Sequence, residues 1–308
     1  MRRIIDAHVH VAPQVKIGQV NAVGVKQLAN GRMQFPNGEI VQMFPELCID
    51  SSFSFETLLA IMDNNNVEKA LILANIGTNL EYNVEMLKQY PGRFAGALII
   101  RQEESCLEMM EHYRACGLSV LKFEMSEGLG YTSPSMYPDF SFDNPLMHKV
   151  YDKAGVLGIT ITIDPSKIGH RGYQVEALEK VTAMYPETHF VICHLGFPDA
   201  NMEKGSDHYQ RWIRMTKLAK RSNVWFDISA LVAFFDAEGY PFPTPVSMVR
   251  EFTDRFGPDK TIWGSDIPGT LCNATYRQMI AMFEKSPLFC EEEKNAMFYQ
   301  NAKEAYLL

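Results

Sequence analysis

The sequence predicts an α/β protein with a (β/α)8 TIM barrel, a single domain over residues 1–308 with a long loop insertion after the first strand. Three observations predict this fold. The chain has 308 residues, which suits one large barrel with insertions. Short apolar runs and helical segments alternate along its length. Most of the short runs are apolar throughout, as in parallel strands that helices cover on both sides.

Eight apolar runs are the expected barrel strands. A doubly wound sheet is the main competitor, but no glycine-rich phosphate loop follows any of the runs. Closure into a barrel would place the first and last strands side by side. The eight runs are Arg3–Val9, Lys69–Asn75, Phe94–Ile100, Ser119–Glu124, Gly158–Asp164, His189–His194, Val224–Ser229 and Thr261–Asp266.

Amphipathic segments between the runs are the expected helices. The first has apolar residues at helical spacing and Ser54 as its N-cap. The expected helices are Phe55–Asn64, Glu81–Gln89, Glu103–Cys116, Leu146–Ala154, Gln174–Met184, Val246–Phe256, Ala274–Glu284 and Glu291–Leu307.

Two connections are too long to be plain turns. Residues 12–52 follow the first strand, and a long loop there often covers the active site. Residues 125–144 follow the fourth strand and carry Tyr131, Tyr137 and Phe140. These aromatic side chains either line the site or pack the loop onto the barrel rim.

Composition excludes several classes of protein. The net charge of −8 disfavours non-specific nucleic-acid binding. The six cysteines are scattered without a CxxC pair, which favours reduced thiols over disulfides or a cysteine zinc site. The N-terminal segment has no apolar stretch of signal-peptide length, and no run reaches the roughly 18 apolar residues that a membrane span needs. We expect a cytoplasmic protein that binds neither nucleic acid nor membrane.

Two histidines, His8 and His10, end the first strand in the sequence HVH. Side chains two apart on a strand point to the same face, so both imidazoles can reach one point at the barrel mouth. Two neutral imidazoles can clamp a divalent metal ion. The alternative is two polar residues where a strand meets solvent.

His194 and Asp266 directly follow the sixth and eighth apolar runs. Such positions lie at the carboxyl ends of barrel strands, where TIM-barrel enzymes have their active sites. Alone, His194 would be a structural histidine and Asp266 the cap of the following turn. Barrel closure would bring both to His8 and His10.

An ordered set of motifs resembles the amidohydrolase superfamily, and within it the ACMSD-like "amidohydrolase 2" branch of hydrolases and decarboxylases. The matching pieces are IIDAHVH, LLAIMDNNNVEKALI, YPGRFAGAL, FVICHLG, IWGSDIP and NAKEAYLL, which follow in order over nearly the whole chain.

The resemblance implies a mechanism and a set of site residues. In relatives that use a metal, the HxH pair and the strand 8 aspartate bind one divalent ion, commonly zinc. Carried over, His8, His10 and Asp266 become metal ligands, with His194 and Asp266 as catalytic residues. Metal-bound water ionises near neutral pH, and His194 would act on it as the general base.

The sequence departs from this pattern at the fifth strand, where Asp164 stands in place of the usual histidine ligand. A carboxylate can bind zinc or manganese, so Asp164 is a candidate fourth ligand. His170 is a weaker candidate. The other alternative is an enzyme without metal, similar to the lactonase branch of the superfamily.

Basic residues near the strand ends would suit a substrate with one or more carboxylates; the alternative is that the loop arginines are solvated and that Ser229 is structural. Arg101, Lys122 and Arg171 are candidate partners for a carboxylate, and Ser229 is a candidate hydrogen-bond donor. Lys122 is the most informative, since a lysine within an apolar strand needs a partner, which Glu124 can provide.

We therefore expect a hydrolase that adds water to a lactone, ester or amide of a small carboxylate-bearing compound. The alternative is a metal-dependent, non-oxidative decarboxylase, and a non-catalytic decayed barrel is the third hypothesis. The resemblance leaves open a homodimer.

Overall fold

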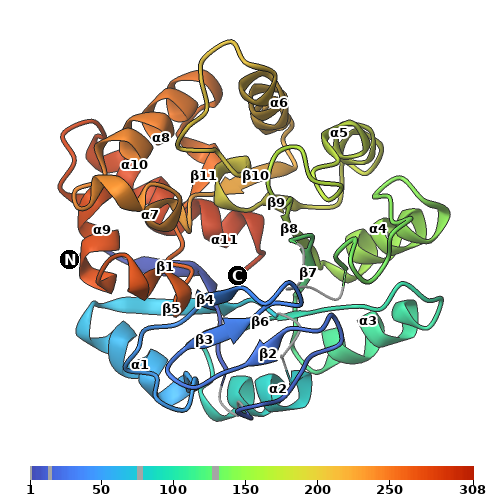
Figure 1. The fold of residues 1–308 in the computed structure, drawn as a ribbon. Helices are drawn as coiled ribbons and strands as arrows, with labels where there is room; N and C mark the ends of the chain where they lie inside the picture. Colours follow the sequence, from blue (N-terminus) through green and yellow to red (C-terminus); the bar gives the residue numbers. More distant parts are fainter. Residues whose placement is uncertain (1, 13–15, 75–78, 127–131) are drawn as a thin grey trace.

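The computed structural model describes residues 2–12, 16–74, 79–126 and 132–308. Its main sheet has eight parallel strands that follow one another in chain order around a ring (Figure 1). The predicted (β/α)8 barrel is confirmed. The strands are β1 (Ile4–Val9), β5 (Val67–Ile72), β6 (Phe94–Leu98), β7 (Val120–Glu124), β8 (Thr160–Asp164), β9 (Phe190–Ile192), β10 (Val224–Asp227) and β11 (Thr261–Ile262).

The ring closes where β11 and the residues after it meet β1. The backbone N–H of Ala7 donates to the carbonyl of Trp263 at 3.2 Å, and that of Asp266 donates to the carbonyl of His8 at 2.7 Å. His10 continues the contact with a 2.8 Å bond to the Ile267 carbonyl. These bonds set Asp266 beside the two histidines of the HVH motif.

Most of the helices surround the barrel on its outside, and α11 lies across one end of it (Figure 1). The first has the predicted bounds, and the Ser54 side chain caps it by accepting from the backbone of Thr57. The helices are α1 (Phe55–Asn64), α2 (Leu80–Gln89), α3 (Cys106–Ala115), α4 (Pro145–Leu157), α5 (Val175–Met184), α6 (Asp207–Thr216), α7 (Leu231–Phe234), α8 (Pro243–Phe256), α9 (Tyr276–Glu284), α10 (Glu291–Asn295) and α11 (Asn301–Ala305).

Three helical regions differ from the expectation, and one of them is the short helix α7, which was not predicted. Helix α6 was not predicted, because its sequence DHYQRWIRMT is strongly polar and only Trp212, Met215 and Thr216 are buried. The C-terminal helix, predicted as continuous, is divided by a π turn over Ala296–Gln300. The Met297 carbonyl in this turn accepts a 2.9 Å bond from the backbone of Trp263, which draws it out of the helical ladder.

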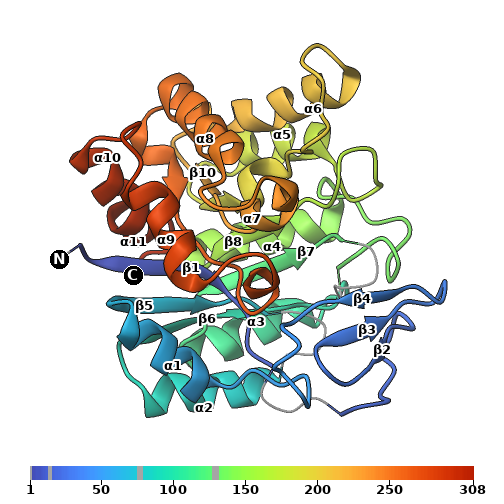
Figure 2. The same ribbon diagram turned by 60° about the vertical axis from the view of Figure 1, so that its left-hand side comes forward.

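The insertion after β1 was expected as a loop and instead contains a small antiparallel sheet. Its strands are β2 (Lys26–Gln27), β3 (Arg32–Gln34) and β4 (Ile40–Gln42). Figure 2 shows this sheet beyond one end of the barrel strands, opposite the end where both chain termini lie. The site residues stand at the same end as the insertion, since they follow the carboxyl ends of the strands.

The other end of the barrel is closed by the C-terminal residues. The Thr160 hydroxyl donates to the Ala305 carbonyl at 2.7 Å, and Tyr306 is fully buried. Within the described residues, no helix has the length and apolar character needed to cross a bilayer.

Candidate active site

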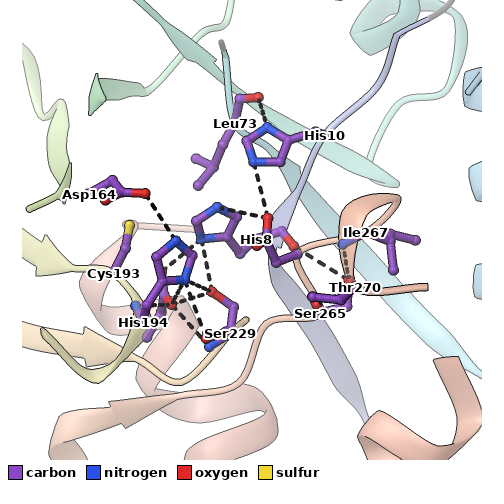
Figure 3. A network of polar contacts seen from close by, with 12 residues as sticks. His8, His10, Leu73, Asp164, Cys193, His194, Ser229, Ser265, Ile267 and Thr270 are labelled. Carbon is purple, nitrogen blue, oxygen red and sulfur yellow. Dashed lines mark hydrogen bonds and ion pairs between the residues drawn. The ribbon is translucent and has the colours of Figure 1, made fainter. Parts of the chain in front are cut away.

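The structure gathers the predicted histidines and aspartates at the carboxyl end of the barrel. His8 and His10 come from β1, Asp164 from the end of β8, His194 from the turn after β9, and Asp266 from the segment after β11. Figure 3 shows His8 between His10 on one side and His194 on the other. The ring centroid of His8 is 5.1 Å from that of His10 and 4.8 Å from that of His194.

His8 is fully buried and oriented by a carboxylate behind it. Its Nδ1 donates to Oδ2 of Asp227 at 2.9 Å, which places the ring proton on Nδ1 and leaves the lone pair on Nε2. Burial opposes the charged ring and lowers the pKa of His8 to about 4, although Asp227 acts in the other direction. At neutral pH His8 is therefore a neutral imidazole with Nε2 as an acceptor.

His10 has the same arrangement with a backbone partner. Its Nδ1 lies 3.0 Å from the carbonyl of Leu73, which can only accept, so this nitrogen carries the proton. Its Nε2 lies 3.2 Å from Oδ1 of Asp266, and Nε2 of His8 lies 3.6 Å from the same oxygen. The side chains of His10 and Asp266 are 17% and 22% exposed, so the group opens to solvent on this side.

His8, His10 and Asp266, here called the ligand cluster, fit a divalent cation. One ligand atom from each residue lies within 4.8 Å of the others. The Nε2 of His8 is buried and has no hydrogen-bond partner among the described residues, which is costly for a polar atom. A proton on Nε2 of His10 would give Asp266 a hydrogen-bond donor, but it would leave Nε2 of His8 without a partner. A cation bound by two imidazoles and a carboxylate satisfies all three, and this donor set suits zinc.

A second group, formed by His8, Cys193 and Asp227, is compact enough for a metal but fits one poorly. The Nζ of Lys122 lies 3.8 Å from the sulfur of Cys193 and would repel a cation. Burial raises the pKa of the Cys193 thiol well above its ordinary value, which keeps it protonated.

The other half of the mouth, here called the His194 network, consists of Asp164, His194, Asp227 and Ser229. The Nε2 of His194 donates to Oδ2 of Asp164 at 3.1 Å, and its Nδ1 donates to Oγ of Ser229 at 2.9 Å. The Ser229 hydroxyl donates a hydrogen bond to Oδ1 of Asp227 at 2.5 Å. Every polar group in this network therefore has a partner.

This pattern makes His194 a donor at both ring nitrogens, because both partners accept. Burial opposes the charge, but Asp164 and then Asp227 outweigh it and raise the pKa of His194 to about 9. Burial also opposes ionisation of Asp164, but His194 outweighs it and lowers the pKa of that carboxyl. The pair is charged at neutral pH.

The backbone at the mouth adopts conformations that most residues avoid. His194, Ala230 and Asp266, each close after the end of its barrel strand, have φ values of 57°, 60° and 61°. Left-handed residues other than glycine are uncommon and cluster at functional sites, where the surrounding structure holds them. At Asp266, this conformation accompanies the backbone bond to His8 that closes the barrel.

Asp227, the last residue of β10, is a central residue of the site to which the sequence analysis assigned no role. It is fully buried and receives bonds from the ring of His8, from the backbone of His194 at 2.9 Å and from Ser229. Burial opposes its ionisation, yet the two histidines lower its pKa below the ordinary value. The sequence signal was a carboxylate at the end of an otherwise apolar strand, since such a group needs partners.

A further buried carboxylate, Asp6, joins β1 to the last strand. Its oxygens accept from the backbone of Ser265 at 2.8 Å and from the Tyr276 hydroxyl at 2.7 Å. Burial raises the pKa of Asp6 to about 6. This network fixes the segment that carries Asp266.

Asp164 is placed differently from the expected metal ligand. Its carboxylate is hydrogen-bonded to Nε2 of His194, and Asp164 is not part of the ligand cluster. His170, the weaker candidate, is exposed in the loop after β8.

The four expected substrate contacts are not brought together. Lys122 is fully buried, with Nζ 3.6 Å from Oε2 of Glu124, so the expected pairing with Glu124 is present but the ammonium does not reach solvent. Ser229 is 1% exposed and its hydroxyl serves the His194 network. Arg101 and Arg171 are exposed, and their side chains make no ion pair with other described residues. In the loop after β7, Tyr131 lies outside the described residues, and Phe140 packs against Phe123 in the core.

Comparison with known proteins identifies the family. The family model described as amidohydrolase, Amidohydro_2, matches residues 5–308. This confirms the resemblance that the motifs indicated. No curated protein matches the chain by sequence.

Several solved structures share the fold. A probable 2-pyrone-4,6-dicarboxylic acid hydrolase from Acinetobacter baumannii, with citric acid bound, has 18% identity and a TM-score of 0.70, with 99% of each chain covered. An amidohydrolase from Burkholderia multivorans with bound zinc has 14% identity and a TM-score of 0.71, also with 99% of each chain covered. The 5-carboxyvanillate decarboxylase from Sphingomonas paucimobilis has 14% identity and a TM-score of 0.65, with 100% of each chain covered.

Proposed function

The chain belongs to the amidohydrolase family, and we propose that it is a zinc-dependent hydrolase that adds water to a lactone, ester or amide of a small carboxylate-bearing compound. The observation that carries this proposal is the lone pair on Nε2 of His8. It is buried without a partner among the described residues, 3.6 Å from Asp266. A cation shared with His10 and Asp266 would satisfy it without disturbing the bond to Asp227.

A divalent ion held by His8, His10 and Asp266 would supply a bound water of near-neutral pKa and polarise a substrate carbonyl. Asp266 is the residue placed to accept the proton of the attacking water, since its carboxylate is partly exposed at the mouth. Burial opposes ionisation of Asp266, but His8, His10 and His194 outweigh it and lower its pKa, so it stays ionised.

His194 serves as a proton donor in this proposal, in place of the general-base role expected from the sequence. Both of its nitrogens donate, so it has no lone pair with which to take a proton from water. When a substrate approaches Nε2, the proton now shared with Asp164 is available for the leaving group. Asp164 then acts as a positioning residue that holds His194 charged and correctly turned.

The substrate's carboxylate is assigned to the exposed arginines Arg101 and Arg171, because Lys122 is enclosed. A guanidinium binds a carboxylate through two parallel hydrogen bonds. A carboxylate-bearing substrate is also in keeping with the citric acid bound in the Acinetobacter structure and with the names of the hydrolase and decarboxylase neighbours.

A second candidate function, non-oxidative decarboxylation, is favoured by the same donor pattern of His194. When a carbon–carboxylate bond breaks, the electron pair stays on the carbon, which then needs a proton. His194 holds one at Nε2, paired to Asp164. The two reactions differ in whether carbon dioxide is released from the substrate.

Elemental analysis of the purified protein tests the proposal, followed by a screen of lactone and ester acids and of aromatic acids. About one equivalent of zinc per chain, with ring or ester opening and no carbon dioxide, supports the hydrolase. Carbon dioxide release from an acid selects the decarboxylase. Full activity without any metal after chelation would overturn both.

A further inference from the structure

The turn after β9 carries His194 in a backbone conformation that its residues do not favour. His194, Leu195, Gly196 and Phe197 have φ values of 57°, 52°, 72° and 65°, all in the left-handed region. Leucine and phenylalanine rarely adopt such values, because their Cβ atoms crowd the backbone. A run of this kind persists only where the surrounding structure holds it. The residues that hold the turn therefore also decide where the His194 ring points.

Two carbonyls of the turn accept hydrogen bonds from side chains outside it. The indole N–H of Trp212 donates to the Leu195 carbonyl at 2.9 Å, and the Tyr173 hydroxyl donates to the Gly196 carbonyl at 3.0 Å. Both donors are buried, with 4% of Trp212 and 2% of Tyr173 exposed. A chain that lacked either donor would leave a buried carbonyl without a partner, which is costly, so the turn would tend to rearrange.

Helix α6 provides much of this support. Two of its three buried residues, Trp212 and Met215, contact the turn. A Cβ at Gly196 would lie 3.0 Å from Cγ of Met215, so glycine is needed there for space as well as for φ. Tyr173 is tied to the same helix, because Nη2 of Arg211 donates to its carbonyl at 3.2 Å. The buried face of α6 thus lies on the turn that carries the proposed proton donor.

The start of the turn is fixed independently of α6. The backbone N–H of His194 donates to Oδ1 of Asp227 at 2.9 Å. The ring then reaches Oδ2 of Asp164 through Nε2 and Oγ of Ser229 through Nδ1. These two ring bonds point to different strands, so they form together only for one direction of the backbone that carries the ring.

We propose that Trp212 and Tyr173 are positioning residues for His194, which hold the turn so that Nε2 of the imidazole stays directed at Asp164. The inference rests on the proposed function, since it takes His194 as the proton donor. The two side chains act through the buried carbonyls of the turn. Loss of either donor lets the turn relax and misdirects the ring, while the ligand cluster keeps its metal, because none of its three residues belongs to the turn.

Nuclear magnetic resonance of zinc-loaded protein, labelled with nitrogen-15 in its histidine rings, tests the positioning in Trp212→Phe and Tyr173→Phe. Each variant keeps an aromatic ring and removes one hydrogen-bond donor. A His194→Gln variant identifies the two ring N–H signals of His194, because it lacks them. We expect at least one of these signals to shift, or to be lost to exchange with water, in each phenylalanine variant. Zinc content should stay at about one equivalent per chain.

Kinetics with the substrate that the activity screen selects give a second readout. In Trp212→Phe and Tyr173→Phe, kcat should fall by about 10- to 100-fold, because a small misplacement of a reacting group is enough for such a loss. KM should change by less than about 2-fold, since the residues proposed to bind the substrate are kept.

Tyr151→Phe is the matched control. Tyr151 is a fully buried tyrosine of α4 whose hydroxyl donates to the Phe142 carbonyl at 2.8 Å, so its variant loses an equivalent bond elsewhere in the core. It should keep the wild-type His194 signals and kcat. Unchanged His194 signals in both Trp212→Phe and Tyr173→Phe, or equal changes in Tyr151→Phe, would overturn the positioning role. The signals need no substrate, so they refute this role alone, whereas absent zinc and absent activity in wild-type protein refute the proposed function.

Discussion

The two halves of the barrel mouth differ in how completely their polar groups are satisfied. In the His194 network each donor meets an acceptor, from Asp164 through His194 and Ser229 to Asp227. In the ligand cluster, acceptors face one another, and His8 Nε2 has no partner among the described residues. Asp227 contacts both halves, because it accepts hydrogen bonds from Nδ1 of His8 and from the backbone N–H of His194. The ligand cluster is the incomplete half, and its unsatisfied acceptors indicate where a cation would bind. The His194 network is the complete half, and its hydrogen bonds indicate which groups orient the proposed ligands and the proposed proton donor.

The largest expected effect comes from removing a ligand from the incomplete half. His8→Ala or Asp266→Asn changes one of the three proposed ligands, and we expect zinc content to fall from about one equivalent per chain to near zero. Elemental analysis after gel filtration measures it. Asp164→Asn, in the complete half, should retain the metal, and equal metal loss in all three variants would erase the distinction between the halves.

The shared residue should give an intermediate effect. Asp227→Asn keeps the shape of the side chain but weakens the bond that orients His8, so zinc affinity should fall by about 10- to 100-fold. Competition with a chromophoric chelator measures the affinity. Unchanged affinity would mean that Asp227 serves the His194 network alone.

Within the complete half, Asp164→Asn should lower kcat by about 10²-fold while zinc content and KM change little, because an amide no longer stabilises the charged His194. The pH profile of kcat should also shift, since His194 would lose its proton at lower pH. Restoration of activity by Asp164→Glu would support the positioning role. A drop in zinc content in Asp164→Asn would instead return Asp164 to the metal ligands.

The last expected effect is on stability. The pKa of His194 rises from 6.5 to about 9 on folding, so its contribution is complete below about pH 6.5 and is lost as the pH rises through about 9. For metal-free protein, this amounts to at most about 3 kcal/mol in the free energy of unfolding. Urea unfolding across this range should show the loss in wild-type protein and much less of it in Asp164→Asn. Parallel pH curves for the two proteins would contradict the ion pair.

The sequence predicted the parts of the site that depend on strand ends. His8, His10, His194 and Asp266 each follow or end an apolar run, and barrel closure is sufficient to bring such residues to one mouth. The sequence could not predict that Asp164 pairs with His194. This pairing depends on how the side chains after β8 and β9 are turned toward each other, which places Oδ2 of Asp164 beside Nε2 of His194. The place of Lys122 within an apolar strand predicted that it needs a partner, but not that its ammonium is cut off from solvent. Ser229 carried no sequence signal for depth. The small sheet in the insertion was missed because its strands are two or three residues long, largely polar, and contain no buried residue.

X-ray absorption at the zinc edge, on protein loaded with one equivalent of zinc, tests most directly whether the incomplete half holds the metal. We expect two imidazole nitrogens and carboxylate or water oxygens at about 2.0–2.2 Å, with no sulfur. A zinc–sulfur distance of about 2.3 Å would place the metal at Cys193 in the other compact group. That result would contradict the assignment of His8, His10 and Asp266.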